Sequence, residues 1–198
     1  MEPLKKNILL LSSGDINGAY EAIYRLGEHF VLQGHQVKML VKTKTKSDDF
    51  IIVYSDIPKS YKRKSIFERL LRKILSKFKK KKIFPRIEYD LNYDFISVDE
   101  TSVNVSPNRI IDLVGFNPDF IYSGMTVDFM NSTDLLHLQQ LTKAQVYNIT
   151  VDMNHFTGGC HFAWDCKGYI EGCSSKCPAI VSDYGKDIPK RNFDTKLN

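Results

Sequence analysis

The first 41 residues carry the pattern that most narrows what this chain can fold into. Asn7–Ser12 is a short, continuous apolar run that a glycine-containing turn ends, as in a strand buried on both faces. Apolar residues then recur at helical spacing from Ala19 to Leu32, and Gly34 supplies a helix stop. A second apolar run, His35–Val41, completes a strand–helix–strand unit. Such a unit opens an α/β fold with a parallel sheet.

Later segments continue the same alternation of strands and helices. The apolar patterns predict strands at Asp49–Tyr54, after Pro118-Asp119 and at Gln145–Val151, and helices at Asn108–Val114 and Leu135–Leu141. At 198 residues the chain has the length of one domain. We therefore predict a single domain over residues 1–198 with a Rossmann-like, doubly wound, mainly parallel sheet.

The ends of the predicted strands mark a candidate site. Ligands of open parallel sheets bind in the crevice beyond the carboxyl ends of the strands. We expect the turn 13–18, the pair Ser123-Gly124 and the segment Asp152–His155 to converge there. Ser123 and Asp152 are candidate substrate-binding residues, although Asp152 fits a turn or helix cap equally well.

All four cysteines lie within eighteen positions of a loop at residues 157–178, which also holds the single tryptophan. With His161 beside them, they could close a structural tetrahedral zinc site, although their spacing is not that of two Cys-x-x-Cys pairs. A reducing compartment favours buried free thiols over disulfides, and both stay open as alternatives. Trp164 and Tyr169 are expected to pack within the loop, and stacking on a ligand is the alternative. The candidate zinc ligands are Cys160, Cys166, Cys173 and Cys177.

The net charge of +5 is concentrated in one segment, since residues 59–86 contain thirteen Lys and Arg residues and a single acid, Glu68. Within it, residues 65–82 predict a basic amphipathic helix, which would pack on the core or lie on a membrane surface. We favour an anionic membrane, because each basic residue near such a surface contributes about 1 kcal/mol. No nucleic-acid partner is expected, since no base-stacking or helix-turn-helix pattern accompanies the charge. The candidate membrane contacts are Lys73, Lys77, Lys79, Lys80, Lys81 and Lys82.

The N-terminal apolar run Ile8–Leu11 is too short for a signal peptide, which needs about 7–15 apolar residues. No apolar run reaches the roughly 18 residues of a membrane span. The expected location is therefore cytoplasmic, peripheral at the inner face of the cell membrane.

The segment from Asp152 to Pro178 resembles a known family. Its pattern Asp-Met-x-x-Phe-Thr-Gly-Gly-Cys-His-Phe-x-x-Asp-Cys-x-x-Tyr, followed by Cys173 and Cys177-Pro178, is similar to the N-terminal domain of bacterial family 4 glycosyltransferases. The resemblance extends back through Asn117–Ile121 to Gly34–Val37. These enzymes have the GT-B fold, in which two Rossmann-like domains face each other across a cleft. The resemblance implies that this chain is the acceptor-side domain and that the donor-binding domain, absent from this sequence, is supplied in cis or in trans.

The resemblance also implies an activity. It is the retaining transfer of a sugar from a nucleotide-sugar donor to a lipid-linked or polysaccharide acceptor, in the assembly of capsule, exopolysaccharide or lipopolysaccharide. The isolated chain would be inactive without the donor domain. In such an enzyme the turn residues Asp15, Asn17 and Gly18 would lie against donor phosphate or acceptor, because Gly18 lets backbone amides approach an anion at a helix N-terminus.

One position departs from the pattern of the family. Many relatives carry a histidine before the Asp-Met pair, where this chain has Val151. The polar contact to substrate then falls to Asp152, His155 or His161, which are the candidate catalytic-rim residues. The alternative function is a non-catalytic, metal-stabilised α/β binding module that recruits a partner chain or a membrane without transferring sugar.

Overall fold

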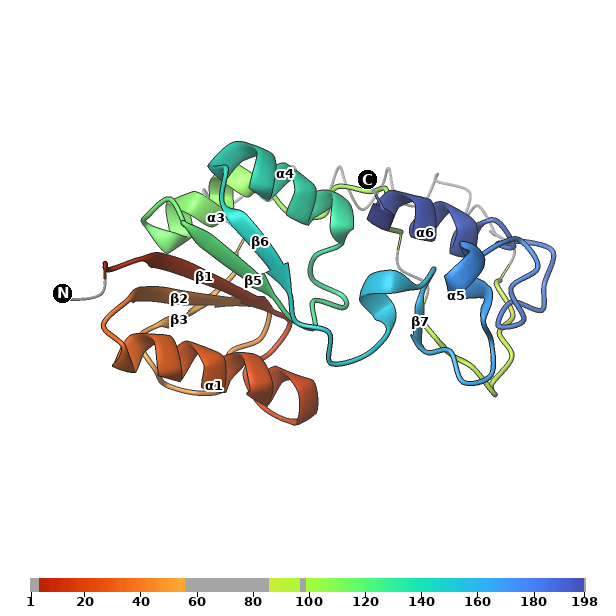
Figure 1. Cartoon of the computed structure of the whole chain (residues 1–198), viewed down its shortest axis with the longest axis horizontal. Helices are drawn as coiled ribbons and strands as arrows, with labels where there is room; N and C mark the ends of the chain where they lie inside the picture. The colour runs from red at the N-terminus through yellow and green to blue at the C-terminus, as the bar shows by residue number, and fades with distance from the viewer. Residues whose placement is uncertain (1–3, 56–85, 97–98, 198) are drawn as a thin grey trace, which may run out of the picture.

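A computed structural model describes residues 4–55, 86–96 and 99–197 of the chain (Figure 1). Its centre is a five-stranded sheet in the order β3-β2-β1-β5-β6, and all neighbouring strands are parallel. The chain starts in the middle of the sheet, builds one side and then crosses to build the other, as doubly wound folds do. The Rossmann-like α/β prediction is confirmed. The strands are β1 (Asn7–Ser12), β2 (Gln36–Val41), β3 (Ile51–Val53), β5 (Phe120–Ser123) and β6 (Gln145–Asn148).

Helices cover both faces of this sheet. In Figure 1, α1 (Gly18–Leu32) lies below the sheet, and α3 (Pro107–Val114) and α4 (Ser132–Thr142) lie above it. Successive residues of β1 therefore enter different cores: Leu10 packs with Ile23 of α1, and Leu9 packs with Leu138 of α4. This arrangement explains why β1 is a continuous apolar run rather than an alternating one.

The predicted elements that fall within the described residues are present, with small shifts at their ends. The strand predicted over residues 145–151 stops at Asn148, and the one predicted over 49–54 is confined to Ile51–Val53. The helix α4 begins at a capping box, in which Asn131 and Asp134 each accept the other's backbone amide hydrogen. This cap fixes the start of α4 close to the carboxyl ends of β5 and β6.

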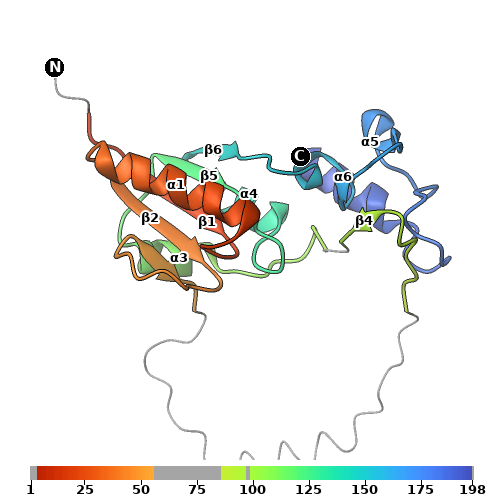
Figure 2. The same cartoon turned by 90° about the horizontal axis from the view of Figure 1, so that it is seen from below.

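A smaller unit lies beyond that edge of the sheet (Figures 1 and 2). Its two strands pair antiparallel, and an isolated bridge joins Tyr89 to Ile180. The segment 86–96 thereby lies along the C-terminal part of the chain, although about 65 residues separate the two strands in sequence. The unit contains β4 (Asp94–Phe95), the 3₁₀ turn η1 (Asn154–Phe156), β7 (Cys160–Phe162), α5 (Gly168–Glu171) and α6 (Ile188–Leu197).

The helix predicted over residues 65–82, with its lysines 73, 77 and 79–82, lies outside the described residues. Among the helices that the structure does describe, none has the length and apolar character needed to cross a bilayer.

Candidate functional site

A pocket of about 270 Å³ opens where the large sheet meets the smaller unit. Its walls come from the carboxyl ends of β5 and β6, the first turn of α4, the turn η1 and the last turn of α6. This is the edge at which parallel α/β sheets bind their ligands. The pocket brings together four of the residues predicted from sequence: Ser123, Asp152, His155 and His161.

Asp152 and His161 form a buried pair in the pocket wall. Nδ1 of His161 lies 2.5 Å from Oδ2 of Asp152, and the two side chains are 5% and 6% exposed. The other carboxylate oxygen accepts the amide hydrogen of Asn154 at 2.8 Å. Asp152 therefore serves both of the roles considered for it, since it closes a turn and also holds the histidine.

Two nitrogen atoms in this wall have no hydrogen-bond partner. They are Nε2 of His161 and Nδ2 of Asn154, and both are buried. Buried polar groups in proteins are nearly always paired, because leaving one unpaired costs about 1–3 kcal/mol. Two unpaired nitrogens in one pocket wall therefore single out this pocket as the candidate binding site, where water or a ligand would supply the missing partners.

His155 also lines the pocket, but its environment differs from that of His161. Burial lowers the pKa of His155, and the positive charge of Lys196 lowers it further, while Asp152 and Glu100 act in the opposite direction. The imidazole is therefore kept neutral to a lower pH than an exposed histidine. It can accept or donate a hydrogen bond without carrying charge.

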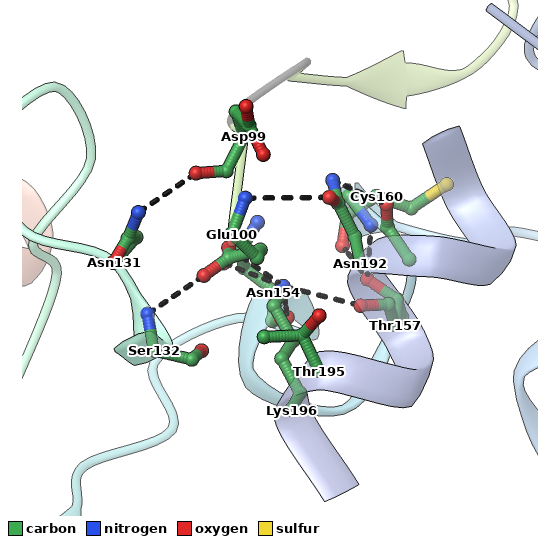
Figure 3. A network of polar contacts seen from close by, with 12 residues as sticks. Asp99, Glu100, Asn131, Ser132, Asn154, Thr157, Cys160, Asn192, Thr195 and Lys196 are labelled. Atoms are coloured by element: carbon green, nitrogen blue, oxygen red, sulfur yellow. Dashed lines mark hydrogen bonds and ion pairs between the residues drawn. The ribbon is translucent and has the colours of Figure 1, made fainter. Parts of the chain in front are cut away.

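A buried ion pair joins the smaller unit to the start of α4 (Figure 3). Nζ of Lys196, near the end of α6, lies 3.3 Å from Oε1 of Glu100, and both side chains are 5% exposed. The ammonium also donates to the carbonyls of Asn154 (2.6 Å) and Thr157 (3.1 Å). The second oxygen of Glu100 accepts from the amide of Ser132 at 2.7 Å. The pair thus fixes three walls of the pocket relative to one another.

Sequence reasoning did not find Glu100 or Lys196 as pocket residues, and it did not single out Asn154 within the predicted segment. Lys196 is one of 28 basic residues and lies in a mixed-charge helix that was not predicted, so no local pattern distinguishes it. Its pairing with Glu100 depends on a contact between segments 96 residues apart. Asn154 stood inside the predicted Asp152–His155 segment, and its unpaired amide becomes evident only in three dimensions.

The turn 13–18 stands behind the pocket rather than in its wall. The Asp15 carboxylate is buried and accepts the amide hydrogens of Thr45 and Lys46 at 2.8 Å each, so it braces a neighbouring loop. Ser13 donates its hydroxyl to the carbonyl of Val127, a residue of the pocket wall. Asn17 and Gly18 have positive φ angles at the start of α1. Of the three segments expected to converge, Ser123-Gly124 and Asp152–His155 line this pocket, and the turn 13–18 does not.

The four cysteines are free thiols. Cys160 and Cys177 hydrogen bond to each other, and the amide of Gly158 donates to Sγ of Cys173 at 3.3 Å. The bond from Cys160 lowers the pKa of Cys177 to about 7 and raises that of Cys160. In the described part of the chain, no three His, Cys, Asp or Glu side chains are placed to hold a metal ion. Zinc binding by this loop stays a prediction from its spacing.

The prediction for Trp164 is wrong. Instead of packing inside the loop, its indole is 70% exposed and lies against Phe162, with ring centroids 5.7 Å apart. Its backbone has a φ of 46°, in the left-handed region, so the chain turns sharply at this residue and directs the side chain outward. Tyr169 packs against Phe156, as expected for a residue within the loop.

Comparisons with protein-family models, with curated proteins and with solved structures give no match to this chain. The class of protein to which this chain belongs is therefore described from its fold and its pocket alone. The chain is a Rossmann-like α/β protein with a polar pocket at the carboxyl edge of its sheet, closed on one side by a small cysteine-containing unit.

Proposed function

We propose that this chain is the acceptor-binding domain of a glycosyltransferase, and that its pocket holds the carbohydrate part of the acceptor. The reaction is the transfer of a sugar from a nucleotide-sugar donor to a lipid-linked or polysaccharide acceptor. The donor is bound by a second domain, in cis or in trans. The resemblance of residues 152–178 to family 4 glycosyltransferases supports this proposal, as does the Rossmann-like sheet.

The main support for the proposal is the polarity of the pocket. Its cation, Lys196, is paired with Glu100 and also donates to two carbonyls. The remaining carboxylate, Asp152, is bonded to His161 and to the amide of Asn154. A phosphate group would find no free positive charge among the described lining residues. Sugar hydroxyls, in contrast, pair well with neutral amides and hydroxyls. Such side chains in the pocket wall include Ser123, Thr126, Gln139 and Asn148.

The same balance of charges favours the acceptor over the donor as the occupant of the pocket. A nucleotide-sugar carries a diphosphate, which proteins bind with basic side chains or free amides at helix N-termini. The first amide of α4, on Ser132, is already bonded to Glu100. A lipid-linked acceptor would in addition bring the chain to a membrane, and the lysine-rich segment 59–86 is suited to an anionic surface.

Saturation-transfer NMR on the purified chain tests this proposal. Methyl glycosides of the common hexoses, and short oligosaccharides, serve as acceptor probes, and nucleotide-sugars serve as donor probes. We expect saturation of sugar protons in at least one glycan, and little on the base protons of nucleotide-sugars. Binding of nucleotide-sugars without binding of any glycan would contradict the acceptor role.

A pair of variants on α4 locates the binding. Gln139 lines the pocket and is exposed, so Gln139→Trp should narrow the mouth and weaken glycan binding at least about tenfold without disturbing the core. Gln140 is exposed on the same helix but is not part of the wall, so Gln140→Trp serves as the matched control. Equal effects of the two substitutions would place the glycan elsewhere.

A further inference from the structure

We infer that Phe162 and Trp164 form a platform on which sugar rings of the acceptor stack where the acceptor continues outside the pocket. This inference rests on the proposed function, because it gives the same acceptor a second contact. It goes further in naming a binding surface outside the pocket, since the described wall of the pocket includes neither aromatic residue.

Trp164 stands at a position that its backbone conformation does not favour. The amide of Cys166 donates to the carbonyl of Ala163 at 2.8 Å, so residues 163–166 form a turn in which Trp164 is second. Its φ of 46° lies in the left-handed region, which glycine and asparagine adopt readily and which strains a residue with a bulky side chain. Local backbone preference therefore does not explain a tryptophan here.

Packing does not explain the tryptophan either. The indole is 70% exposed, whereas Ala163 immediately before it is buried. The amide of Ala163 donates to Sδ of Met153 at 3.4 Å, so the start of the turn is held in place while the indole points away from the core. A strained residue whose side chain adds little to the core is typical of functional sites, where binding rather than folding uses the side chain.

Phe162 extends the exposed apolar surface from one ring to two. Its side chain is 46% exposed, and its ring centroid lies 5.7 Å from that of Trp164, with an angle of 32° between the two planes. Neighbouring exposed rings, unlike single scattered apolar residues, are a mark of a binding surface. The two side chains therefore form one apolar platform.

The charges directly beside the rings favour a neutral ligand that carries hydroxyl groups. Asp94 is paired with Phe162 across the two strands β4 and β7, so both side chains lie on the same face, and Asp165 follows Trp164 in the turn. Both carboxylates are exposed. A sugar places its C–H bonds on an aromatic ring and donates hydrogen bonds from its hydroxyls to carboxylates. The phosphates of an anionic lipid surface would instead be repelled by the two acids.

The size of the pocket requires such an additional surface for a long acceptor. The pocket volume of about 270 Å³ is below the roughly 300–1,000 Å³ of pockets that enclose drug-sized ligands. A polysaccharide acceptor therefore places only its end in the pocket and leaves the rest of its length on the surface of the protein.

The platform is attached directly to the pocket wall. Phe162 follows His161, a residue of the wall, in β7. Met153, which holds the turn of Trp164, stands between the wall residues Asp152 and Asn154. Because successive residues of a strand face opposite sides, the acceptor passes around the edge of the wall to reach the rings.

The fluorescence of Trp164 tests the platform in the unmodified chain, because this is the only tryptophan of the sequence. An exposed indole emits at long wavelength, and a sugar ring stacked on it shifts the emission to shorter wavelength. The probes are tetrasaccharides of glucose, galactose and mannose. We expect a blue shift that saturates with at least one of them, and none with the methyl glycosides, which occupy only the pocket. Absence of a shift with every tetrasaccharide would overturn the platform.

Other outcomes separate the platform from the proposed function. A tetrasaccharide that binds in saturation-transfer NMR without moving the emission contradicts the platform and leaves the glycosyltransferase proposal standing. A shift in a chain whose pocket amides do not respond to the same tetrasaccharide supports the platform and contradicts the pocket as the acceptor site. A blue shift that vesicles of anionic lipid or a lysine-rich peptide produce, and that no tetrasaccharide produces, would assign the rings to a membrane or to a protein partner and overturn the inference.

Substitutions of Trp164 give a second readout. Asparagine suits the left-handed backbone, so Trp164→Asn should keep or raise the urea midpoint while it weakens tetrasaccharide binding about three- to tenfold, the size expected for one lost aromatic contact. Trp164→Phe keeps a ring and should lose less affinity. Leu32→Asn, at an exposed apolar residue at the end of α1, is the control and should bind as the unmodified chain does. A lower urea midpoint for Trp164→Asn, or unchanged affinity, would contradict the platform.

Discussion

The buried pair Lys196–Glu100 is the most consequential single contact in the molecule, because it connects the last helix to the first turn of α4 through the pocket wall. Taking two charges out of water is costly, so the pair adds little net stability compared with an apolar packing. The pair instead holds α6 in position relative to the start of α4. Removing one partner leaves the other charge buried and uncompensated, and that change carries a large penalty.

Lys196→Met should therefore lower the free energy of unfolding by about 3–5 kcal/mol. The control is Lys190→Met on the same helix, whose partner Asp194 lies at the surface with 50% of its side chain exposed. That substitution should cost less than about 1 kcal/mol. Urea denaturation of both variants measures the difference. Similar losses of unfolding free energy in the two variants would contradict a larger role for the buried pair than for the surface pair.

His155 makes the folding stability of the protein depend on pH. Burial is the largest cause of its lowered pKa, so the unfolded chain binds a proton at a higher pH than the folded chain does. Stability is consequently retained above about pH 6.5 and falls as the pH decreases below that value. His155→Gln should remove this part of the acid sensitivity, and His29→Gln, at an exposed position, should not. Urea unfolding at pH 7 and pH 5 measures both, and equal pH slopes in the two variants would contradict the assignment.

At the scale of the elements, α6 packs closely against the loop after η1. A Cβ atom added to Gly158 would lie 2.2 Å from the backbone carbonyl oxygen of Pro189, a contact that no rotamer change relieves. The side chain of Asn192 also donates to the carbonyl of Gly158. The glycine is required here because two backbones touch.

Gly158→Ala should thus destabilise the chain by about 1–3 kcal/mol, through overpacking against α6. Gly168→Ala is the control, because its new Cβ would meet its nearest neighbour, Sγ of Cys166, at an ordinary 3.5 Å. Amide hydrogen exchange should show faster exchange across α6 in the first variant and little change in the second. Protection of α6 that is unaffected by Gly158→Ala would contradict the close packing.

The sequence predicted the large sheet well because each of its elements is specified locally. β1 has four consecutive apolar residues, and α1 has a regular apolar stripe with a glycine shortly after it. The smaller unit was not predicted, because its elements β4, β7 and α5 have only two to four residues each. Elements this short are determined by distant contacts, such as the pairing of β4 with β7, rather than by periodicity.

The distinction between local patterns and distant contacts also applies to the residues of the pocket. Ser123 and Asp152 were predictable because they follow strands of a parallel sheet, where ligand sites lie. Asp15 also follows a strand, but it does not line the pocket. Its carboxylate instead accepts hydrogen bonds from the backbone amides of Thr45 and Lys46. Which polar side chains remain unpaired is decided by the whole set of hydrogen bonds, and that information is absent from a local pattern.

At the scale of the whole molecule, basic residues are most densely clustered in one segment of the sequence. The lysine-rich segment 59–86 holds thirteen of the 28 Lys and Arg residues and a single acid, while the pocket offers no free cation among its described residues. Substituting Lys79–Lys82 by glutamine should weaken binding to vesicles containing anionic lipid at least about tenfold, since each lysine contributes about 1 kcal/mol near such a surface. Sedimentation with anionic and with purely zwitterionic vesicles measures the effect. Equal binding of the substituted and unmodified chains would remove the membrane from the proposed function.

The central claim is that the pocket at the carboxyl edge of the sheet binds an uncharged carbohydrate. The most direct test is a titration of the ¹⁵N-labelled chain with a methyl glycoside or short oligosaccharide, followed by amide proton–nitrogen spectra. We predict shifts that saturate and that cluster at Ser123–Met125, Asn131–Thr133 and Asp152–His155, and that disappear in the Gln139→Trp variant. Saturating shifts confined to other parts of the chain, or no shifts with any glycan tested, would contradict the account.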